Sequence, residues 1–240
     1  MNPPLLQIQD MTKRFGGFTA LDQVTIEIAR GARFGLIGPN GSGKTTLINC
    51  VSGVLAPDGG TIRFDGTDIT TLKAHRRTRL GIARGFQIPK PFASMTVREN
   101  LAVPLEYAAG ARIGPGIEDE VGEILAMVGL EEKAEANAAG LTQIEMRKLE
   151  LARALAAKPV LLISDEAMAG LSSTEVDDIL AILLILNERG ITVIMIEHIM
   201  RAVMRFSERI AVLDAGRKIA EGTPEEILRD AGVERAYLGE

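Results

Sequence analysis

The stretch GPNGSGKTT at 38–46 constrains the fold of this chain more than any other segment. It fits the pattern G-x-x-x-x-G-K-S/T, and it lies between a short apolar run at 33–38 and a segment of helical character from about Lys44 to Val54. Glycines let the backbone curl so that its N–H groups point inward around phosphate oxygens. The strand–turn–helix setting therefore favours a nucleotide site over a flexible turn with a surface lysine.

We expect the residues of this turn to bind the nucleotide together. The Lys44 side chain can reach the β- and γ-phosphates, and the Thr45 hydroxyl can ligate Mg²⁺. The full set that we predict to contact the nucleotide is Gly38, Pro39, Asn40, Gly41, Ser42, Gly43, Lys44, Thr45 and Thr46.

A second motif, LLISDE at 161–166, ends a buried strand with two acids. Carboxylates at the carboxyl end of a parallel strand lie beside the phosphate-binding turn in open α/β sheets. On its own such a run is often a solvated strand end, and the turn at 38–46 is what favours a functional interpretation. We expect Asp165 to hold Mg²⁺ through water, and Glu166 to orient or deprotonate an attacking water.

Strand-like and helix-like segments alternate along the chain. Period-two patterns predict strands within 6–15 and 24–29, and GGTIRFDG at 59–66 is typical of an edge hairpin element. Further buried strands are predicted at 160–164 and 191–196, with helices between and after them. This alternation predicts an α/β fold with a mostly parallel sheet and helices on both of its faces.

The stretch 93–157 has helical character and is predicted to form an insertion in the α/β fold. Its first helix has a capping-box start at Thr96 and Glu99, and a later helix start follows Thr142. Helix starts carry free N–H groups and favour anions, so the start near Thr142 either faces a phosphate or is a capped end at the surface. The residues at 223–226 predict the start of the final helix.

Composition argues against several classes of protein. The 27 Lys and Arg residues and 32 Asp and Glu residues give a net charge of −5, which disfavours a nucleic-acid partner. The basic run HRRTR at 75–79 is best explained as a solvated helix face. The longest apolar run, at 179–186, is too short to span a bilayer, and no signal peptide is evident. Cys50 has the context of a small core residue.

The order and spacing of these motifs resemble the nucleotide-binding subunit of an ABC transporter. The resemblance also draws on Gln87, AGLS at 169–172 and His198, and it covers essentially the whole chain. It implies a P-loop NTPase fold with a mostly parallel core sheet, an N-terminal antiparallel β subdomain and an inserted helical subdomain. Four segments are similar to the importer subfamily for branched-chain and other hydrophobic amino acids: GIARGFQIPKPFASMTVREN, DEAMAGLSSTE, IEHIM and ERAYLGE.

The resemblance implies roles for residues whose ordinary interpretation would be core or surface. By that resemblance Phe15 stacks on adenine, with Phe18 as the other candidate in the same loop. Gln87 senses Mg²⁺ and couples to the membrane subunit, and His198 contacts the γ-phosphate. Residues 169–172 form the loop that touches the partner subunit.

The family completes each active site across a dimer with a segment that reads L-S-G-G-Q, and the matching residues here are LTQIE at 141–145. Thr142 keeps a hydroxyl that can donate to the γ-phosphate of the opposing nucleotide. Both glycines are missing, and Glu145 replaces a neutral glutamine. A carboxylate at that place repels a triphosphate unless it turns away, or it stabilises the first turn of the helix through the dipole. We expect this helix start to face nucleotide through Thr142 and backbone N–H groups.

The function implied by the resemblance is ATP binding and hydrolysis, with Mg²⁺, in an importer that takes up branched-chain or related amino acids or small organic acids. The implied partners are a second nucleotide-binding subunit (self or paralogue), transmembrane permease subunits and, indirectly, a solute-binding protein. The chain would be one domain, with a catalytic lobe at about 1–92 and 158–240 and a helical lobe at about 93–157. It would lie peripherally on the cytoplasmic face of the inner membrane.

Three alternatives remain open at this point. One is the ATPase subunit of an exporter of similar architecture. Another is a soluble ATPase of the same family that acts in translation or DNA repair, although such relatives usually carry two of these domains or a long coiled coil. The third is a subunit that gates transport but hydrolyses ATP poorly, which the altered LTQIE segment would support.

Overall fold

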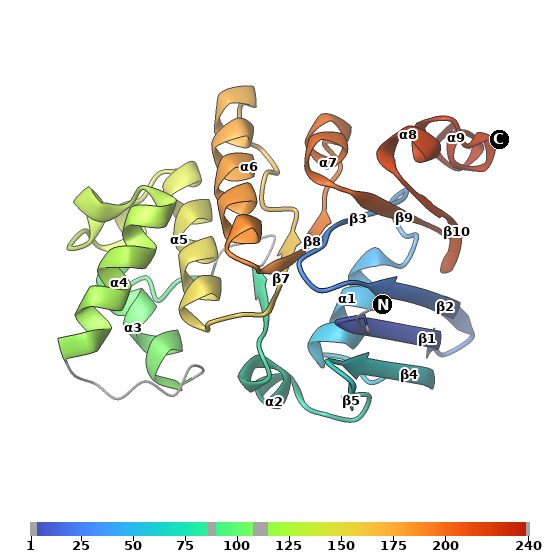
Figure 1. Ribbon diagram of the computed structural model, residues 1–240, viewed down its shortest axis with the longest axis horizontal. Coiled ribbons are helices and arrows are strands. Elements are labelled where there is room, and N and C mark those ends of the chain that lie inside the picture. Colours follow the sequence, from blue (N-terminus) through green and yellow to red (C-terminus); the bar gives the residue numbers. More distant parts are fainter. Residues whose placement is uncertain (1–3, 86–89, 108–114, 239–240) are drawn as a thin grey trace.

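A six-stranded sheet forms the centre of the protein (Figure 1). The computed structural model describes residues 4–85, 90–107 and 115–238. The strand order is β10–β9–β3–β8–β7–β6, and all neighbours are parallel except β10, which is antiparallel to β9. The bounds are β3 Arg33–Ile37, β6 Ile82–Gly85, β7 Leu161–Asp165, β8 Thr192–Ile196, β9 Arg209–Asp214 and β10 Arg217–Gly222. The predicted mostly parallel core sheet is therefore confirmed.

Helices cover both faces of this sheet, as the sequence predicts. Leu162 of β7 packs in the core beneath α5 (Gln143–Ala156) and α6 (Ser173–Glu188), whereas Ile163 packs in the core that contains α1 (Lys44–Ser52). Every residue of β7 and β8 is buried, because a parallel strand with helices above and below has no polar face.

An antiparallel sheet of four strands packs on the other side of α1. Its order is β2–β1–β4–β5, with bounds β1 Leu6–Phe15, β2 Phe18–Ile28, β4 Gly59–Phe64 and β5 Thr67–Asp68. Ile8, Ile26 and Ile62 share one core with Leu47 and Ile48 of α1. The predicted edge position of 59–66 is wrong in one respect: β4 pairs with β1 on one side, and the two-residue β5 forms the edge.

The region after β8 differs from the expected run of helices. α7 (Met200–Phe206) is followed by the β9–β10 hairpin, and then by α8 (Pro224–Leu228) and α9 (Ala231–Leu238). The segment at 209–214 is a short apolar run, which periodicity cannot distinguish from a buried helix. The capping box at Thr223 and Glu226 is present, but it begins α8, and α9 is the last helix.

Three helices pack together beyond α6 (Figure 1). They are α3 (Val97–Tyr107), α4 (Pro115–Val128) and α5, and two short 3₁₀ turns at Glu131–Lys133 and Ala138–Gly140 connect α4 to α5. The predicted capping box before α3 is present: Thr96 N–H donates to Glu99 Oε2 at 2.8 Å, and Glu99 N–H donates to Thr96 Oγ1 at 3.1 Å. Among the described helices, none has the length and apolar character needed to cross a bilayer.

The basic run at 75–79 is not simply a solvated face, because α2 (Ala74–Arg79) turns Arg77 inward. Its side chain is 1% exposed, and it donates hydrogen bonds to four backbone carbonyls, those of Thr70, Leu72, Cys50 and Val51. These bonds join α2 to the last turn of α1. Cys50 is fully buried, and burial raises the pKa of its thiol to about 11, as expected for a core cysteine.

Replacing the buried arginine should destabilise the fold. We expect Arg77→Met to reduce the free energy of unfolding by about 3 kcal/mol, because four carbonyls lose their charged donor while the side-chain length is kept. Arg79 lies on the exposed side of the same helix, so Arg79→Met should change it by no more than about 0.5 kcal/mol. Urea unfolding of both variants measures this difference. Equal losses in the two variants would contradict an inward role for Arg77.

Candidate active site

The turn after β3 has a backbone that only glycine can adopt at its two ends. Gly38 has φ 148° and Gly43 has φ 105°. A Cβ atom at Gly38 would collide with the Leu213 carbonyl oxygen, and one at Gly43 would lie 2.7 Å from the Ala20 carbonyl oxygen. By contrast, a Cβ at Gly41, which lines a pocket, would meet nothing within 4 Å. The turn is therefore tightly packed at its two ends and has open space beside Gly41.

Two backbone hydrogen bonds fix this turn from the side of the β9–β10 hairpin. Gly216 N–H donates to the Ser42 carbonyl at 3.0 Å, and Asp22 N–H donates to the Gly216 carbonyl at 2.8 Å. Gly216 has φ 79° and follows Ala215, which has φ 44°. The hairpin that the sequence analysis missed thus connects the phosphate-binding turn to β2 of the antiparallel sheet.

α1 begins at Lys44 without a side-chain cap, since its N-cap residue is Gly43. Its first N–H groups and the positive end of its dipole are therefore available to an anion. The Lys44 ammonium donates to the carbonyls of Gly38 at 2.8 Å and Pro39 at 3.0 Å. Burial lowers the pKa of Lys44, and the nearby carboxylates of Glu166 and Asp165 oppose that shift.

One pocket brings most of the predicted residues together. It has a volume of about 290 Å³ and is lined by Phe15, Phe18, Ala20, Asn40, Gly41, Ser42, Gly43, Lys44, Thr45, Thr46, Glu166 and His198. The rings of Phe15 and Phe18 are 47% and 64% exposed, so both are accessible to a planar ligand at its rim. Two aromatic rings, the glycines and lysine of the turn, one carboxylate and one histidine, from four separate segments, therefore share one cavity.

Glu166 and His198 contact each other across the ends of β7 and β8. His198 Nε2 lies 3.0 Å from Glu166 Oε1. The Glu166 backbone has φ 50°, an uncommon conformation for a residue other than glycine, and its N–H donates to the Ile196 carbonyl at 2.9 Å. The strained backbone directs the carboxylate toward the pocket instead of along the strand.

Asp165 is more deeply placed than its neighbour and does not line the pocket. It is 5% exposed, and its Oδ2 accepts a hydrogen bond from Arg84 Nη2 at 2.6 Å. Arg84 Nη1 in turn donates to Asn49 Oδ1 of α1 at 2.7 Å. The sequence analysis did not single out Arg84, although an arginine inside the short strand run GIARG signals a buried ion pair. The pair orients the Asp165 carboxylate beside α1.

α5 begins at Gln143, and Thr142 caps it. The Thr142 N–H donates to Glu145 Oε2 at 2.8 Å, and the Glu145 N–H donates to Thr142 Oγ1 at 3.4 Å. The other Glu145 oxygen pairs with Lys133 Nζ at 3.3 Å. The hydrogen bond from Thr142 N–H, with the help of Lys133, lowers the pKa of Glu145. The Glu145 carboxylate therefore turns back onto the start of its own helix. Of the two outcomes expected for Glu145, this is the one in which it does not repel a triphosphate.

Four predicted residues that the structure describes do not line the pocket: Gly38, Pro39, Asp165 and Thr142. Gln87 lies outside the described residues.

Comparison with known proteins identifies the family. The family described as ABC transporter matches residues 21–169, and the one described as branched-chain amino acid ATP-binding cassette transporter matches residues 217–240. This chain belongs to the ABC transporter family.

Relatives match over the full length of the cassette. The high-affinity branched-chain amino acid transport ATP-binding protein BraF of Pseudomonas aeruginosa is 39% identical over 100% of both chains. LivG of Escherichia coli K12, which has the same description, is 37% identical over 100% of both chains. These relatives are subunits of transport systems.

Solved ABC cassettes share the fold. An ATP-binding cassette of an ABC transporter has a TM-score of 0.90 at 32% identity and covers 98% of each chain. The ADP conformation of such a cassette has a TM-score of 0.87 at 34% identity and covers 99% of each chain. The P-loop NTPase fold predicted from the sequence is confirmed, and with it nucleotide binding and the ATPase activity of the family.

The tight packing around Gly38 in the phosphate loop predicts that this residue is essential for ATP affinity. We expect Gly38→Ala to weaken ATP binding by about 100-fold, because the new Cβ pushes the loop away from the Leu213 carbonyl by an ångström or so. Gly190 also has positive φ, but a Cβ there meets nothing within 4 Å. Gly190→Ala should leave the affinity unchanged. Titration with a fluorescent ATP analogue measures both, and an unchanged affinity in Gly38→Ala would contradict the tight outer packing.

Proposed function

We propose that this chain is the ATP-hydrolysing subunit of an importer for branched-chain or related amino acids, or small organic acids. Transport would pass through separate membrane subunits. Full-length similarity to BraF and LivG, together with the match of residues 217–240 to the branched-chain subfamily, supports the cargo class. The observation that carries the catalytic part is the single pocket shared by the phosphate loop, Glu166 and His198.

The loop suits the triphosphate of ATP as substrate. There is open space beside Gly41, and the first N–H groups of α1 carry no side-chain cap. The Lys44 ammonium, which now donates to two loop carbonyls, is placed to bind the β- and γ-phosphates. The other residues of the loop from Gly38 to Thr46 would provide backbone donors, except Pro39, which has no N–H. Phe15, exposed at the rim of the pocket, would stack on the adenine.

The residues beside the loop also suit Mg²⁺. The exposed Thr45 hydroxyl and the Asp165 carboxylate are hard oxygen donors of the kind that Mg²⁺ prefers, and Gln87 would supply a third. Bound there, Mg²⁺ would neutralise charge on the phosphate oxygens. Arg84 keeps the Asp165 carboxylate oriented until the ion binds.

Glu166 would serve as the base and His198 as a donor. The Glu166 carboxylate would orient the attacking water and accept its proton, since it lies in the pocket at the end of β7. His198 Nε2, now 3.0 Å from Glu166, would hydrogen bond the γ-phosphate. Lys44 and His198 together would stabilise the negative charge that develops on the transferred phosphoryl oxygens.

A second nucleotide-binding subunit, either another copy or a paralogue, would complete the site. The Thr142 hydroxyl accepts a hydrogen bond from Glu145 N–H and also hydrogen bonds the Glu145 carboxylate. Turned away from that carboxylate, the hydroxyl would donate its hydrogen to the γ-phosphate of the opposing nucleotide. The Lys133 ammonium and the Thr142 N–H compensate the negative charge of the Glu145 carboxylate. A solved relative, a dimeric ATP-binding cassette bound to ADP and Pi, is 28% identical to this chain with a TM-score of 0.82. The match covers 91% of this chain and 98% of the relative.

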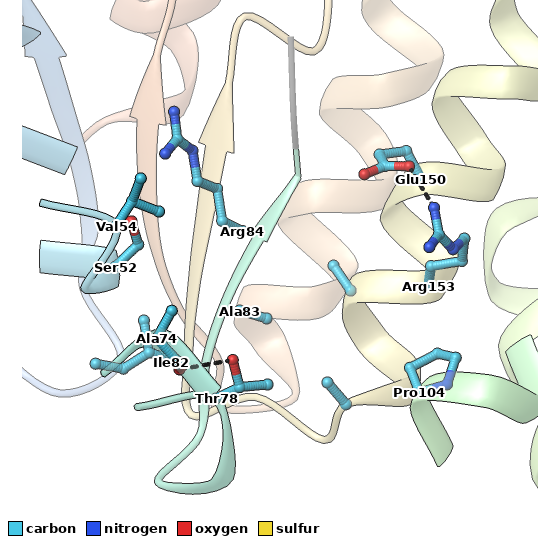
Figure 2. A pocket seen from close by; sticks show the side chains of 12 residues that line it. Ser52, Val54, Ala74, Thr78, Ile82, Ala83, Arg84, Pro104, Glu150 and Arg153 are labelled. Atoms are coloured by element: carbon cyan, nitrogen blue, oxygen red, sulfur yellow. Dashed lines mark hydrogen bonds and ion pairs between the residues drawn. The ribbon is translucent and has the colours of Figure 1, made fainter. Parts of the chain in front are cut away.

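A groove of about 300 Å³ separates the helices α3 and α5 from α1, α2 and β6 (Figure 2). Small and apolar side chains line most of it, among them Val54, Ala74, Ala83 and Pro104. Arg153 and Glu150 form an ion pair of 3.1 Å on one wall (Figure 2). We assign this groove to the permease, and through the permease to a solute-binding protein, with no nucleic acid as partner.

Assigning the groove to the permease also suggests how the chain divides into lobes and where it lies in the cell. The groove would lie between a helical lobe at about 93–157 and a catalytic lobe at about 1–92 and 158–240, both parts of one domain that spans 1–240. Contact with the permease would hold the chain peripherally on the cytoplasmic face of the inner membrane.

Uptake of radiolabelled leucine in cells that lack this chain tests the proposal. The unaltered chain should restore uptake, and Glu166→Gln should not, because ATP hydrolysis falls by about 100-fold or more without the base. Full leucine uptake in cells that lack the chain would overturn the proposed cargo. Full ATP hydrolysis by purified Glu166→Gln protein would overturn the role of Glu166.

The same assay tests the groove. Val54 is 59% exposed in the groove and Leu228 is 69% exposed on α8. We expect Val54→Asp to abolish uptake and to leave the ATPase of the purified chain unchanged, whereas Leu228→Asp should leave both unchanged. Normal uptake with Val54→Asp would contradict permease docking at this groove.

A further inference from the structure

The residue in the place of the first signature glycine makes a contact that glycine could not make. Gln143 Nε2 donates to the Ala169 carbonyl at 3.3 Å. Its amide group also packs against Gly170, where a Cβ would lie 2.7 Å from Gln143 Nε2. Gly170 has φ 79°, so the loop approaches α5 closely at a position that favours glycine. The side chain that departs from the family pattern therefore reaches the loop that follows Glu166 in the same chain.

Arg147, one helical turn further along α5, reaches the same carbonyl. Its Nη2 donates to the Ala169 carbonyl at 3.2 Å, and the residue is 8% exposed. Residues four apart on a helix lie on one face, so Gln143 and Arg147 converge on one acceptor. Burial lowers the pKa of Arg147, and the carboxylates of Glu197, Glu150 and Glu166 oppose the shift.

Glu197 holds the same loop from the sheet. It follows β8, is 2% exposed, and its Oε1 accepts a hydrogen bond from Met168 N–H at 2.8 Å. Burial raises its pKa to about 7, while its hydrogen bonds to the backbone N–H groups of Met168 and His198 oppose the shift. The loop at 167–171 is thus held on its N–H side by Glu197 and on its carbonyl side by α5.

We propose that Gln143, Arg147 and Glu197 are positioning residues that make α5 and the loop at 167–171 move as one unit. This inference rests on the proposed function, in which the start of α5 serves the opposing nucleotide. Thr142 lies next to Gln143, and Glu166 and His198 lie next to the loop and to Glu197. The three residues therefore couple the helix start that serves one active site to the catalytic carboxylate of the other.

Amide hydrogen exchange in the nucleotide-free chain tests the contact by itself. Gln143→Met keeps the length and helix propensity of the side chain but removes its donor. We expect amides of residues 168–171 to exchange about fivefold faster in this variant, because one hydrogen bond is lost. Gln7→Met is the matched control, since Gln7 Nε2 also donates at 3.3 Å, to Glu27 on the antiparallel sheet. Unchanged exchange at 168–171 in Gln143→Met would overturn the proposal.

Steady-state ATP hydrolysis tests the coupling. In Gln143→Met and Arg147→Met we expect kcat to fall by about fivefold, the Hill coefficient for ATP to fall toward one, and KM to stay constant, because the phosphate loop is untouched. Arg147→Lys keeps a donor and should recover part of the loss, and Gln7→Met should behave as the unaltered chain. Faster exchange with an unchanged kcat and Hill coefficient would mean that the three residues only stabilise the local structure. That result would overturn the proposed coupling between the two active sites.

Failure of the proposed function would look different. ATP hydrolysis without cooperativity by the unaltered chain would contradict the dimeric mechanism. It would therefore also contradict the coupling, which depends on that mechanism. The exchange measurement would still show whether Gln143 holds the loop.

Discussion

The structure depends on the fixed backbone of the phosphate loop. A loop that presents N–H groups to a triphosphate must hold its shape before the ligand arrives, since each N–H is useful only in one direction. Here the loop is held between the Leu213 and Ala20 carbonyls, and by the hydrogen bond from Gly216 to Ser42. β3 extends from one end of the loop between the two cores, and α1 extends from the other end into the core that it shares with the antiparallel sheet. The antiparallel sheet and the β9–β10 hairpin both serve to hold it.

The carboxyl ends of the parallel strands then explain why the other residues converge. β7 ends at Asp165 and is followed by Glu166, and β8 is followed by Glu197 and His198. β8 pairs with both β3 and β7. Side chains that are far apart in the sequence therefore meet at one edge of the sheet. The Glu166–His198 contact is a direct consequence of this register.

Much of this arrangement was predictable from the sequence, because the phosphate loop and the apolar strands carry strong local patterns. The β9–β10 hairpin was missed because the four-residue apolar run at 210–213 has no diagnostic period. Arg77 was misjudged because charge alone does not tell which side of a short helix faces inward. Arg147 and Glu197 escaped notice because their buried charges leave no local pattern: their partners come from distant segments. Arg84 was missed although its place inside a strand run could have indicated a buried ion pair.

The signature segment shows how a departure from the family pattern can be accommodated. Glu145 turns back onto the Thr142 N–H and Lys133, and Gln143 bonds to the Ala169 carbonyl. Thr142 itself is exposed at the helix start. We propose that this start, although altered, binds the nucleotide of a second copy.

Light scattering on the Glu166→Gln protein, with and without Mg-ATP, tests that claim most directly. We expect a monomer without nucleotide and a dimer with Mg-ATP. Adding Thr142→Ala should abolish the dimer, whereas Thr223→Ala, which removes the equivalent cap of α8, should not. A protein that stays monomeric with Mg-ATP, or a dimer that survives Thr142→Ala, would contradict it.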